Sequence, residues 1–194
     1  MKIYKLSKKD RPEEWAEMKD WFEKRTAKHI KLVQKYCKKI ADYDDKFADL
    51  IARGEVHDQS KFEDPEIDPY IYISWKYKCK DDGIDFEVPD DIDDKMNAAT
   101  EHHILNNFHH PEYHCEKKTD LINEKNRDKP PEEMIDATKM KDLDLSEMVC
   151  DWMAMSEEKG GTPKKWADDN VNVRWKFTDD QKDLIYELIE GVWE

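Results

Sequence analysis

Hydrophobic side chains recur at spacings of three and four residues through most of the first forty positions of the chain. The positions that share this pattern are Trp15, Met18, Phe22, Thr26, His29, Val33, Tyr36 and Ile40. The spacing is the period of one face of an α-helix. Asp10, followed by Pro12 and Glu13, supplies the residue types that begin a helix. The pattern therefore predicts one long amphipathic helix.

Similar but shorter patterns predict further helices along the rest of the chain. They are expected at about 44–53, 70–77, 91–107, 144–158 and 162–171, and after the capping box of Thr178 and Gln181. The run YIYISWKY at 70–77 fits a strand as well as a helix by propensity, and its helical neighbours favour a helix. Gly54, Gly160 and Gly161 are expected to end the helices that precede them. We therefore predict an all-α fold, built as a helical bundle.

Two polar stretches are expected to connect these helices. Residues 80–91 (KDDGIDFEVPDD) are acidic and contain both Gly and Pro, which predicts a surface loop. Residues 116–131 are polar and contain a Pro-Pro step, which predicts a flexible connection. The length of 194 residues is about that of one domain, so a single domain over 1–194 is expected.

The composition agrees with a helical globular protein. Charged residues make up 41% of the 194 residues and hydrophobic ones 38%, with only 5 glycines. No hydrophobic run approaches the roughly 18 residues of a membrane span, and the charged start MKIYKLSKKD has no apolar signal region behind it. The cysteines show no C-x-x-C spacing, which favours reduced thiols and a cytoplasmic protein. They are Cys37, Cys79, Cys115 and Cys150.

Charge is unevenly distributed along the chain. The net charge is -14, but residues 1–40 hold 13 Lys or Arg and 6 Asp or Glu, a balance of +7 that leaves -21 for the rest. The acidic total disfavours binding to duplex nucleic acid, and nothing indicates a membrane partner. The basic start is either a solvated helix face or the mouth of a basic pocket. Self-association into a homo-oligomer stays open.

Two polar residues occupy positions that the helical pattern would bury. His29 lies within the hydrophobic face of the first helix, and Asp151 has Met148, Trp152 and Met155 around it at helical spacings. A buried carboxylate needs a cation, a metal or several hydrogen-bond donors beside it. A lone histidine in such a position is most often a hydrogen-bonded core residue. His29 is therefore either a core histidine or a ligand in a site that it shares with Asp151.

The adjacent pair His57 and Asp58 offers two kinds of metal ligand, a neutral imidazole nitrogen and an anionic carboxylate. Together with His29 upstream and Asp151 downstream, the pair gives the order H…HD…D. This order resembles the HD superfamily of metal-dependent phosphohydrolases, which are all-helical proteins. The resemblance covers about residues 22–160 and implies that these four residues hold a divalent metal.

The residues after the pair extend the resemblance. HDQSK looks like the H-D-x-x-K form of the branch that opens cyclic dinucleotides, in which the lysine meets the substrate phosphate. Lys61 is thus expected to bind substrate and, with Asp58, to act in catalysis. Four residues after His57, Lys61 would lie one helical turn further along, where its charge would repel a metal but suit a phosphate.

A histidine cluster at 102–110 resembles the additional ligands of branches that bind two or three metals, with the order H…HD…H…HH…D. His103 shares a stripe with the hydrophobic residues of its helix, so we prefer it to His102 as a ligand. His110 follows His103 by nearly two helical turns and is preferred to His109, which is left as a substrate contact. One or two divalent ions of Mn, Mg, Fe, Co or Zn are expected.

The nearest resemblance is to a small uncharacterised bacterial and phage family that shares RGEVHDQSKF, HHILNNFHHPEYH and EMVCDWMAMS.

Glu147, one turn before Asp151, is either an exposed helix charge or a group that orients a ligand or a water molecule. The chain lacks the motifs of P-loop, dinucleotide-fold and nucleophile-elbow enzymes. The sequence therefore predicts a metal-dependent phosphohydrolase acting on a nucleotide or another small phosphoester. The alternatives are a non-catalytic metal-containing binding or interaction module, and a di-iron oxygenase on the same scaffold, as in inositol oxygenase.

Overall fold

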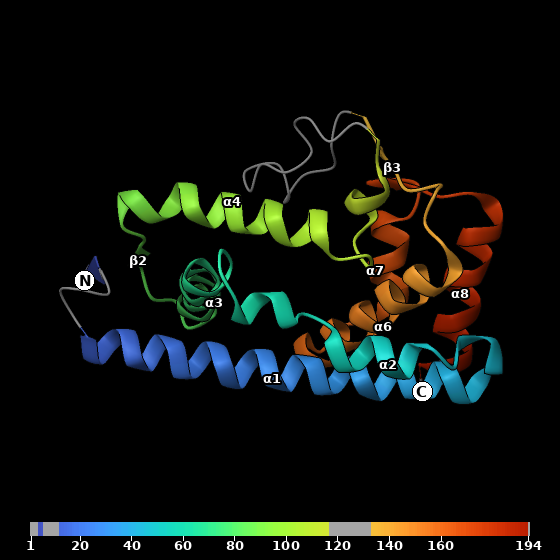
Figure 1. Cartoon of the computed structure of the whole chain (residues 1–194), viewed down its shortest axis with the longest axis horizontal. Helices are drawn as coiled ribbons and strands as arrows, with labels where there is room; N and C mark the ends of the chain where they lie inside the picture. The colour runs from blue at the N-terminus through green and yellow to red at the C-terminus, as the bar shows by residue number, and fades with distance from the viewer. Residues whose placement is uncertain (1–3, 6–11, 117–132, 194) are drawn as a thin grey trace. The chain divides into compact units, whose positions relative to one another are not determined.

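The computed structural model describes residues 4–5, 12–116 and 133–193 of the chain (Figure 1). Its α-helices are α1 (Pro12–Tyr43), α2 (Leu50–Val56), α3 (Ile67–Asp81), α4 (Asp90–Asn106), α6 (Asp142–Lys159), α7 (Pro163–Asn170) and α8 (Asp179–Val192). The shorter elements are the 3-10 helices η1 (Asp45–Phe47), η2 (Gln59–Phe62) and η3 (Pro111–His114) and the strands β1 (Tyr4–Lys5), β2 (Phe86–Glu87), β3 (Ile135–Asp136) and β4 (Trp175–Lys176). The prediction of an all-α fold is confirmed.

The chain divides into two compact units, each made of two separate stretches. The first unit consists of Met1–Lys28 and Gln59–His103, and the second of His29–Asp58 and Ile104–Glu194. Helices α1 and α4 each contribute residues to both units. This division does not test the expected single domain. The predicted helix start at Asp10 lies outside the described residues, and so does the predicted connection over 116–131 apart from Glu116.

In the first unit, α3 packs against η2, and the unit has a small core that is rich in aromatic residues. The first half of α1 supplies Met18 and Phe22, which lie on its predicted face and are 0% and 1% exposed. Partners for them come from α3 and α4, namely Ile71, Tyr72 and Met96. The run YIYISWKY is thus helical, because a helix lets both of its sides pack. Strands β1 and β2 form a parallel pair that the sequence did not predict.

The second unit is built around α6, which packs against α2, α7 and α8. Most of the residues of α6 are buried, as expected of a central helix that is covered on several sides. The second half of α1 adds Val33, Tyr36 and Ile40 to the same core. Strands β3 and β4 form a parallel pair in this unit. The core therefore surrounds the helix that carries Asp151.

Gly160 ends a helix as predicted, whereas Gly54 does not. Gly160 adopts a left-handed backbone conformation with φ 72° directly after α6, as its lack of a Cβ allows. Gly54 was expected to end a helix at 44–53, and that prediction is wrong: α2 runs through it to Val56, after η1. A Cβ at Gly54 would lie 3.2 Å from Sγ of Cys37 and 3.4 Å from Cα of Gln34. A side chain at Gly54 would therefore press against α1, which glycine avoids.

The capping box at the start of α8 is present. The hydroxyl of Thr178 accepts a hydrogen bond of 3.2 Å from the backbone amide of Gln181, whose side chain accepts one of 2.9 Å from the amide of Thr178. Thr178→Ala is expected to lower the free energy of unfolding by about 1 kcal/mol, because an amide at the helix start loses its acceptor. Urea denaturation measures this change. Thr178→Ser keeps the hydroxyl and is the control; equal stability of the two variants would contradict the prediction.

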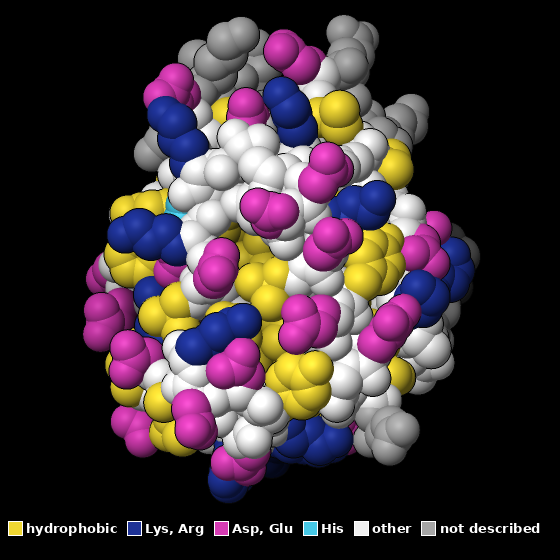
Figure 2. All heavy atoms as spheres, turned by 90° about the vertical axis from the view of Figure 1, so that its right-hand side faces the viewer, with side chains coloured by type: hydrophobic (Ala, Val, Ile, Leu, Met, Phe, Trp, Pro, Cys, Tyr) yellow, Lys and Arg dark blue, Asp and Glu magenta, His cyan; other side chains and the backbone are white. Residues whose placement is uncertain are grey.

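Charges of both signs are interspersed on the face shown in Figure 2, with hydrophobic side chains among them. On α1, Lys24 pairs with Asp20 at 2.7 Å and Lys38 with Asp42 at 2.7 Å, and all four side chains are well exposed. These two lysines agree with the alternative that the basic residues of 1–40 form a solvated helix face. Among the described helices, none combines the length and the hydrophobicity that a membrane span requires.

Candidate metal site

Helix α1 carries His29 into the interior of the second unit, where the residue is 4% exposed. Its Nε2 lies 3.0 Å from Oδ1 of Asp151 and 3.8 Å from Oδ2 of Asp58. Its Nδ1 lies 3.7 Å from Oε2 of Glu158. The imidazole is therefore surrounded by three carboxylates. His29 shares its surroundings with Asp151 as expected, and its role as a ligand stays a prediction.

The backbone after α2 turns His57 and Asp58 inward together. His57 leaves the helix with φ -55° and ψ 132°, and Asp58 follows with φ 60°. A left-handed conformation costs roughly 1–2 kcal/mol for most residues with a Cβ, and Asp and Asn adopt it more readily than others. The two side chains are 0% and 2% exposed. The sharp turn is what lets two neighbours in sequence face the same interior point.

Helix α6 presents three acidic residues at spacings of four and seven, so that they share one face. They are Glu147, Asp151 and Glu158. Glu147 is 3% exposed, so the alternative that it is an exposed helix charge is wrong. The Asp151 side chain is 21% exposed, which makes it the most accessible member of the group around His29.

The carboxylates shift the titration of His29 strongly. Burial alone would lower the pKa of His29, but the contacts with Asp151 and Glu158 and the charges of Asp151 and Asp58 outweigh burial and raise that pKa to about 9. Burial alone would likewise raise the pKa of Asp151, yet its hydrogen bond with His29 and the charge of His29 hold that pKa well below its usual range. The cluster therefore stabilises positive charge at its centre.

The donor set fits a metal ion. Nδ1 of His57 lies 2.9 Å from Oε1 of Glu147, whereas its Nε2 is buried and has no hydrogen-bond partner among the described residues. That Nε2 faces Oδ1 of Asp58 at 3.8 Å. Imidazole nitrogens and carboxylate oxygens are common ligands of divalent transition metals. A cation between them would satisfy a buried nitrogen that no hydrogen bond serves.

His109 joins this cluster. Its ring lies 4.2 Å from that of His57, and its Nε2 lies 3.9 Å from Oδ1 of Asp58. Burial, followed by the nearby charge of His57, lowers the pKa of His109, which favours the neutral imidazole that a metal needs. The role of His109 as a substrate contact stays a prediction. Its position beside His57 and Asp58 also suits a ligand.

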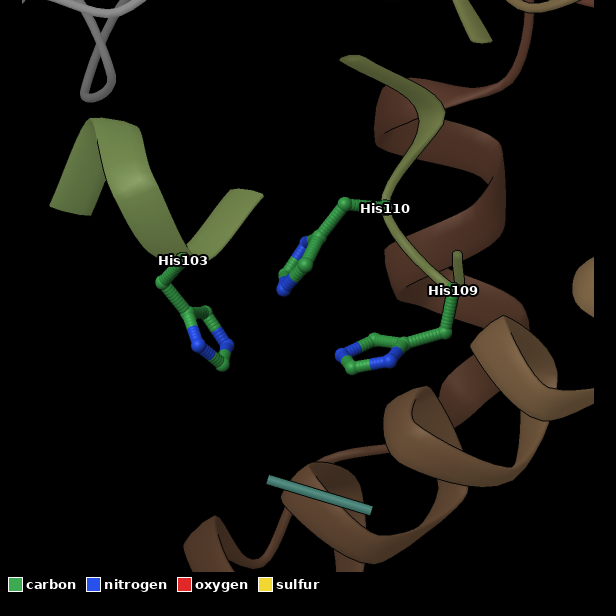
Figure 3. A group of neighbouring side chains, drawn as sticks. All are labelled: His103, His109 and His110. Atoms are coloured by element: carbon green, nitrogen blue, oxygen red, sulfur yellow. The ribbon is translucent and has the colours of Figure 1, made fainter. Parts of the chain in front are cut away.

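His110 does not continue the helix that carries His103, although its spacing of seven residues predicted that it would. Figure 3 shows His109 and His110 on the segment after α4, and their ring centroids are 4.2 Å apart. Helix α4 ends at Asn106, and the amide of His110 donates to the carbonyl of Asn107 in a turn. The helical relation between His103 and His110 is therefore absent. The role of His110 as a ligand stays a prediction.

His103 and Lys61 belong to the first unit. His103, which Figure 3 labels on the last turn of α4, is 2% exposed, and its Nδ1 lies 2.9 Å from Oε2 of Glu66. The choice of His103 over His102 as the inward residue agrees with the 40% exposure of the His102 side chain. Its part in metal binding stays a prediction.

The ammonium of Lys61 lies 5.2 Å from the centre of the Tyr70 ring. The predicted helical relation between His57 and Lys61 is wrong, since α2 ends at Val56 and Asp58 has a positive φ. The expected contact of Lys61 with phosphate remains untested.

The structure thus brings together four of the six predicted ligands and adds others within the second unit. His29, His57 and Asp58 offer ligand atoms within 4.8 Å of one another, and so do His57, His109 and Glu147. Sequence reasoning missed Glu158 and Arg53. The spacing of seven from Asp151 to Glu158 could have revealed the former, whereas nothing in the sequence pattern marked Arg53.

The fold and this site define an all-α protein whose second unit holds a buried cluster of histidines and carboxylates that could bind a metal ion. A family model matches residues 18–191, and the chain belongs to that family, which is described as a family of unknown function, DUF5662. The matched range includes every residue of the cluster. The chain matches none of the curated proteins and none of the solved structures with which it was compared.

Proposed function

We propose that this protein is a metal-dependent phosphohydrolase of the HD type that acts on a nucleotide or another small phosphoester. The observation that carries the proposal is the buried approach of His29, His57, Asp58 and Asp151 to one another, although they come from three elements far apart in sequence. Their order along the chain is the order on which the resemblance to HD phosphohydrolases rests. Four reduced, buried thiols suit a protein of the cytoplasm.

These four residues would hold the metal, and the position of His109 makes it a fifth candidate ligand. A divalent ion in such a set supplies Lewis acidity to a phosphoryl oxygen and acidifies a water molecule. The surrounding carboxylates of Asp58, Asp151 and Glu158 would otherwise repel a phosphate. Substrate binding is therefore expected only after the cation has neutralised part of this charge.

Exposure at Asp151 favours a catalytic over a purely structural metal. Structural sites are closed by protein ligands, whereas catalytic sites keep an open position for water or substrate. His29, His57 and Asp58 are at most 4% exposed, while the Asp151 side chain is 21% exposed. Asp151, on α6, is thus the most exposed of these four residues. This exposure favours the catalytic alternative over the non-catalytic one.

A direct test combines metal analysis with an activity screen. The purified protein is expected to contain a divalent metal, and the protein stripped with a chelator should release phosphate from nucleotides or small phosphoesters only after Mn, Mg, Co, Fe or Zn is added back. Stripped protein without added metal is the control. Absence of metal binding, or phosphate release that does not depend on metal, would refute the proposal. Oxygen consumption by an iron-loaded form without phosphate release would establish the di-iron oxygenase instead, an alternative that the additional histidine at 109 supports.

A further inference from the structure

One carboxylate contacts two of the imidazoles at the candidate metal site. Oε1 of Glu147 lies 2.9 Å from Nδ1 of His57 and 3.4 Å from Nδ1 of His109. Both rings use Nδ1 for this contact, so both Nε2 atoms lie on the edge of the ring that is turned away from Glu147. They face Oδ1 of Asp58 at 3.8 and 3.9 Å. Glu147 therefore touches both rings at the edge opposite to the one that would bind a metal.

The other oxygen of Glu147 is held by an arginine. Nε and Nη2 of Arg53 lie 2.7 and 2.6 Å from Oε2 of Glu147, and Nη2 is also 2.9 Å from Oδ1 of Asp144. The guanidinium lies 5.0 Å from the centre of the Phe108 ring. Arg53 is thus fixed by two carboxylates and an aromatic ring. Its contacts leave Oε1 of Glu147 directed to the histidines.

The contacts of Glu147 decide which ring nitrogens carry hydrogen. Nε and Nη2 of Arg53 both donate to Oε2 of Glu147, because a guanidinium has donors and no acceptor. A carboxylate paired with a guanidinium in this way can only accept hydrogen bonds. Each Nδ1 must therefore donate, which leaves a lone pair on each Nε2 when the ring is neutral. That tautomer is the one that can bind a metal through Nε2.

We propose that Glu147, clamped by Arg53, is a positioning residue that fixes the orientation and the tautomer of both His57 and His109 and so sets the metal affinity of the site. The inference rests on the proposed metal site. A carboxylate behind a metal-binding histidine is a common arrangement, and its loss typically weakens metal binding by about 10- to 100-fold. Here a single carboxylate serves two histidines, so its removal affects two ligands at once.

Glu147→Gln is the variant that tests this role. An amide cannot present acceptor oxygens to both Arg53 and the histidines. If its oxygen faces the rings, its NH2 group opposes the Arg53 donors; if it is flipped, its NH2 group faces Nδ1 and favours the tautomer with hydrogen on Nε2. Titration calorimetry of the full chain with Co²⁺ is expected to show binding weakened by about 10- to 100-fold. Glu157→Gln, on the same helix and bonded to Lys35 and Tyr36, is the matched control and should bind Co²⁺ like the parent.

A second readout separates positioning from mere packing. Nitrogen-15 NMR of the metal-free protein should show hydrogen on Nδ1 of both His57 and His109 in the parent, and a population with hydrogen on Nε2 in Glu147→Gln. Unchanged tautomers or an unchanged Co²⁺ affinity in a folded Glu147→Gln protein would overturn the inference. Should this variant fail to fold, Arg53→Gln decides, since the Arg53 side chain is already 23% exposed. Arg53→Gln is expected to weaken Co²⁺ binding, as Glu147→Gln does. An affinity equal to that of the parent would overturn the inference.

The same measurements distinguish this inference from the proposed function. A parent protein that does not bind Co²⁺ would overturn both the metal site and the role of Glu147. A parent that binds Co²⁺ and loses affinity with Glu147→Gln, but releases no phosphate from any substrate, would support the positioning role and count only against the hydrolase.

Discussion

Asp58→Asn is expected to remove bound metal and turnover together, with metal affinity falling by more than about 100-fold. That figure is the upper end of what the loss of an outer carboxylate costs, and Asp58 would contact the metal itself. Asparagine preserves the size of the side chain and tolerates the left-handed backbone at φ 60°. The variant therefore removes a charge from the site without adding backbone strain.

Metal content, phosphate release and the thermal melting curve should be measured on the same preparation of Asp58→Asn. Asp42→Asn removes an exposed carboxylate that pairs with Lys38 on α1 and serves as the control for a change of charge alone. The control should retain metal and activity. Stoichiometric metal in a folded Asp58→Asn protein would show that the ligand assignment is wrong.

Lys61→Ala is expected to lower turnover by about 100-fold while leaving metal content and melting temperature unchanged. Removal of one preorganised electrostatic contact to a transition state typically has an effect of about this size. Lys61 follows Asp58 by three residues, a stretch that spans at most about 11 Å of extended chain. Chain connectivity therefore limits the distance between the Cα atoms of Asp58 and Lys61 to about 11 Å, which is compatible with the proposed contact of Lys61 with phosphate.

The control for Lys61 is a lysine outside this neighbourhood. Lys165→Ala removes a well-exposed ammonium on α7 that pairs with Asp169 and should leave turnover unchanged. Unchanged turnover in Lys61→Ala would assign Lys61 to the surface charge of the protein. Loss of metal with the lysine would mean that it supports the metal site and does not act on the substrate.

The helices were predictable because their hydrophobic periodicity and end signals agree. The face of α1, the capping box at Thr178 and the end of α6 at Gly160 are all local features that the structure reproduces. Gly54 was misread because a glycine that ends a helix and one that admits a close neighbour look identical in sequence. Only the approach of Cys37 and Gln34 distinguishes the two cases.

The site was predictable where it depends on helix faces, and not where it depends on turns. His29 and Asp151 stand on helical stripes, so burial of His29 followed from spacing. The inward turn of Asp58 needs a positive φ, which no periodicity reveals. The choice between His109 and His110 failed as a phase argument because α4 ends at Asn106. Arg53 takes part through a fold-dependent contact with α6, for which the sequence carried no signal.

The second unit is made of two stretches that are far apart in sequence, so its parts leave the ribosome at different times during synthesis. Contacts such as those of Tyr36 with Glu157 and of Lys39 with the carbonyl of Val192 join residues 121 and 153 positions apart. At about 5 to 20 residues per second, α6 leaves the ribosome roughly 6 to 25 seconds after the second half of α1. Until then, the hydrophobic stripe of α1 has no partner from α6 or α8. We therefore expect the nascent chain to acquire metal affinity only after α6 has emerged, so that cofactor loading follows translation of most of the protein.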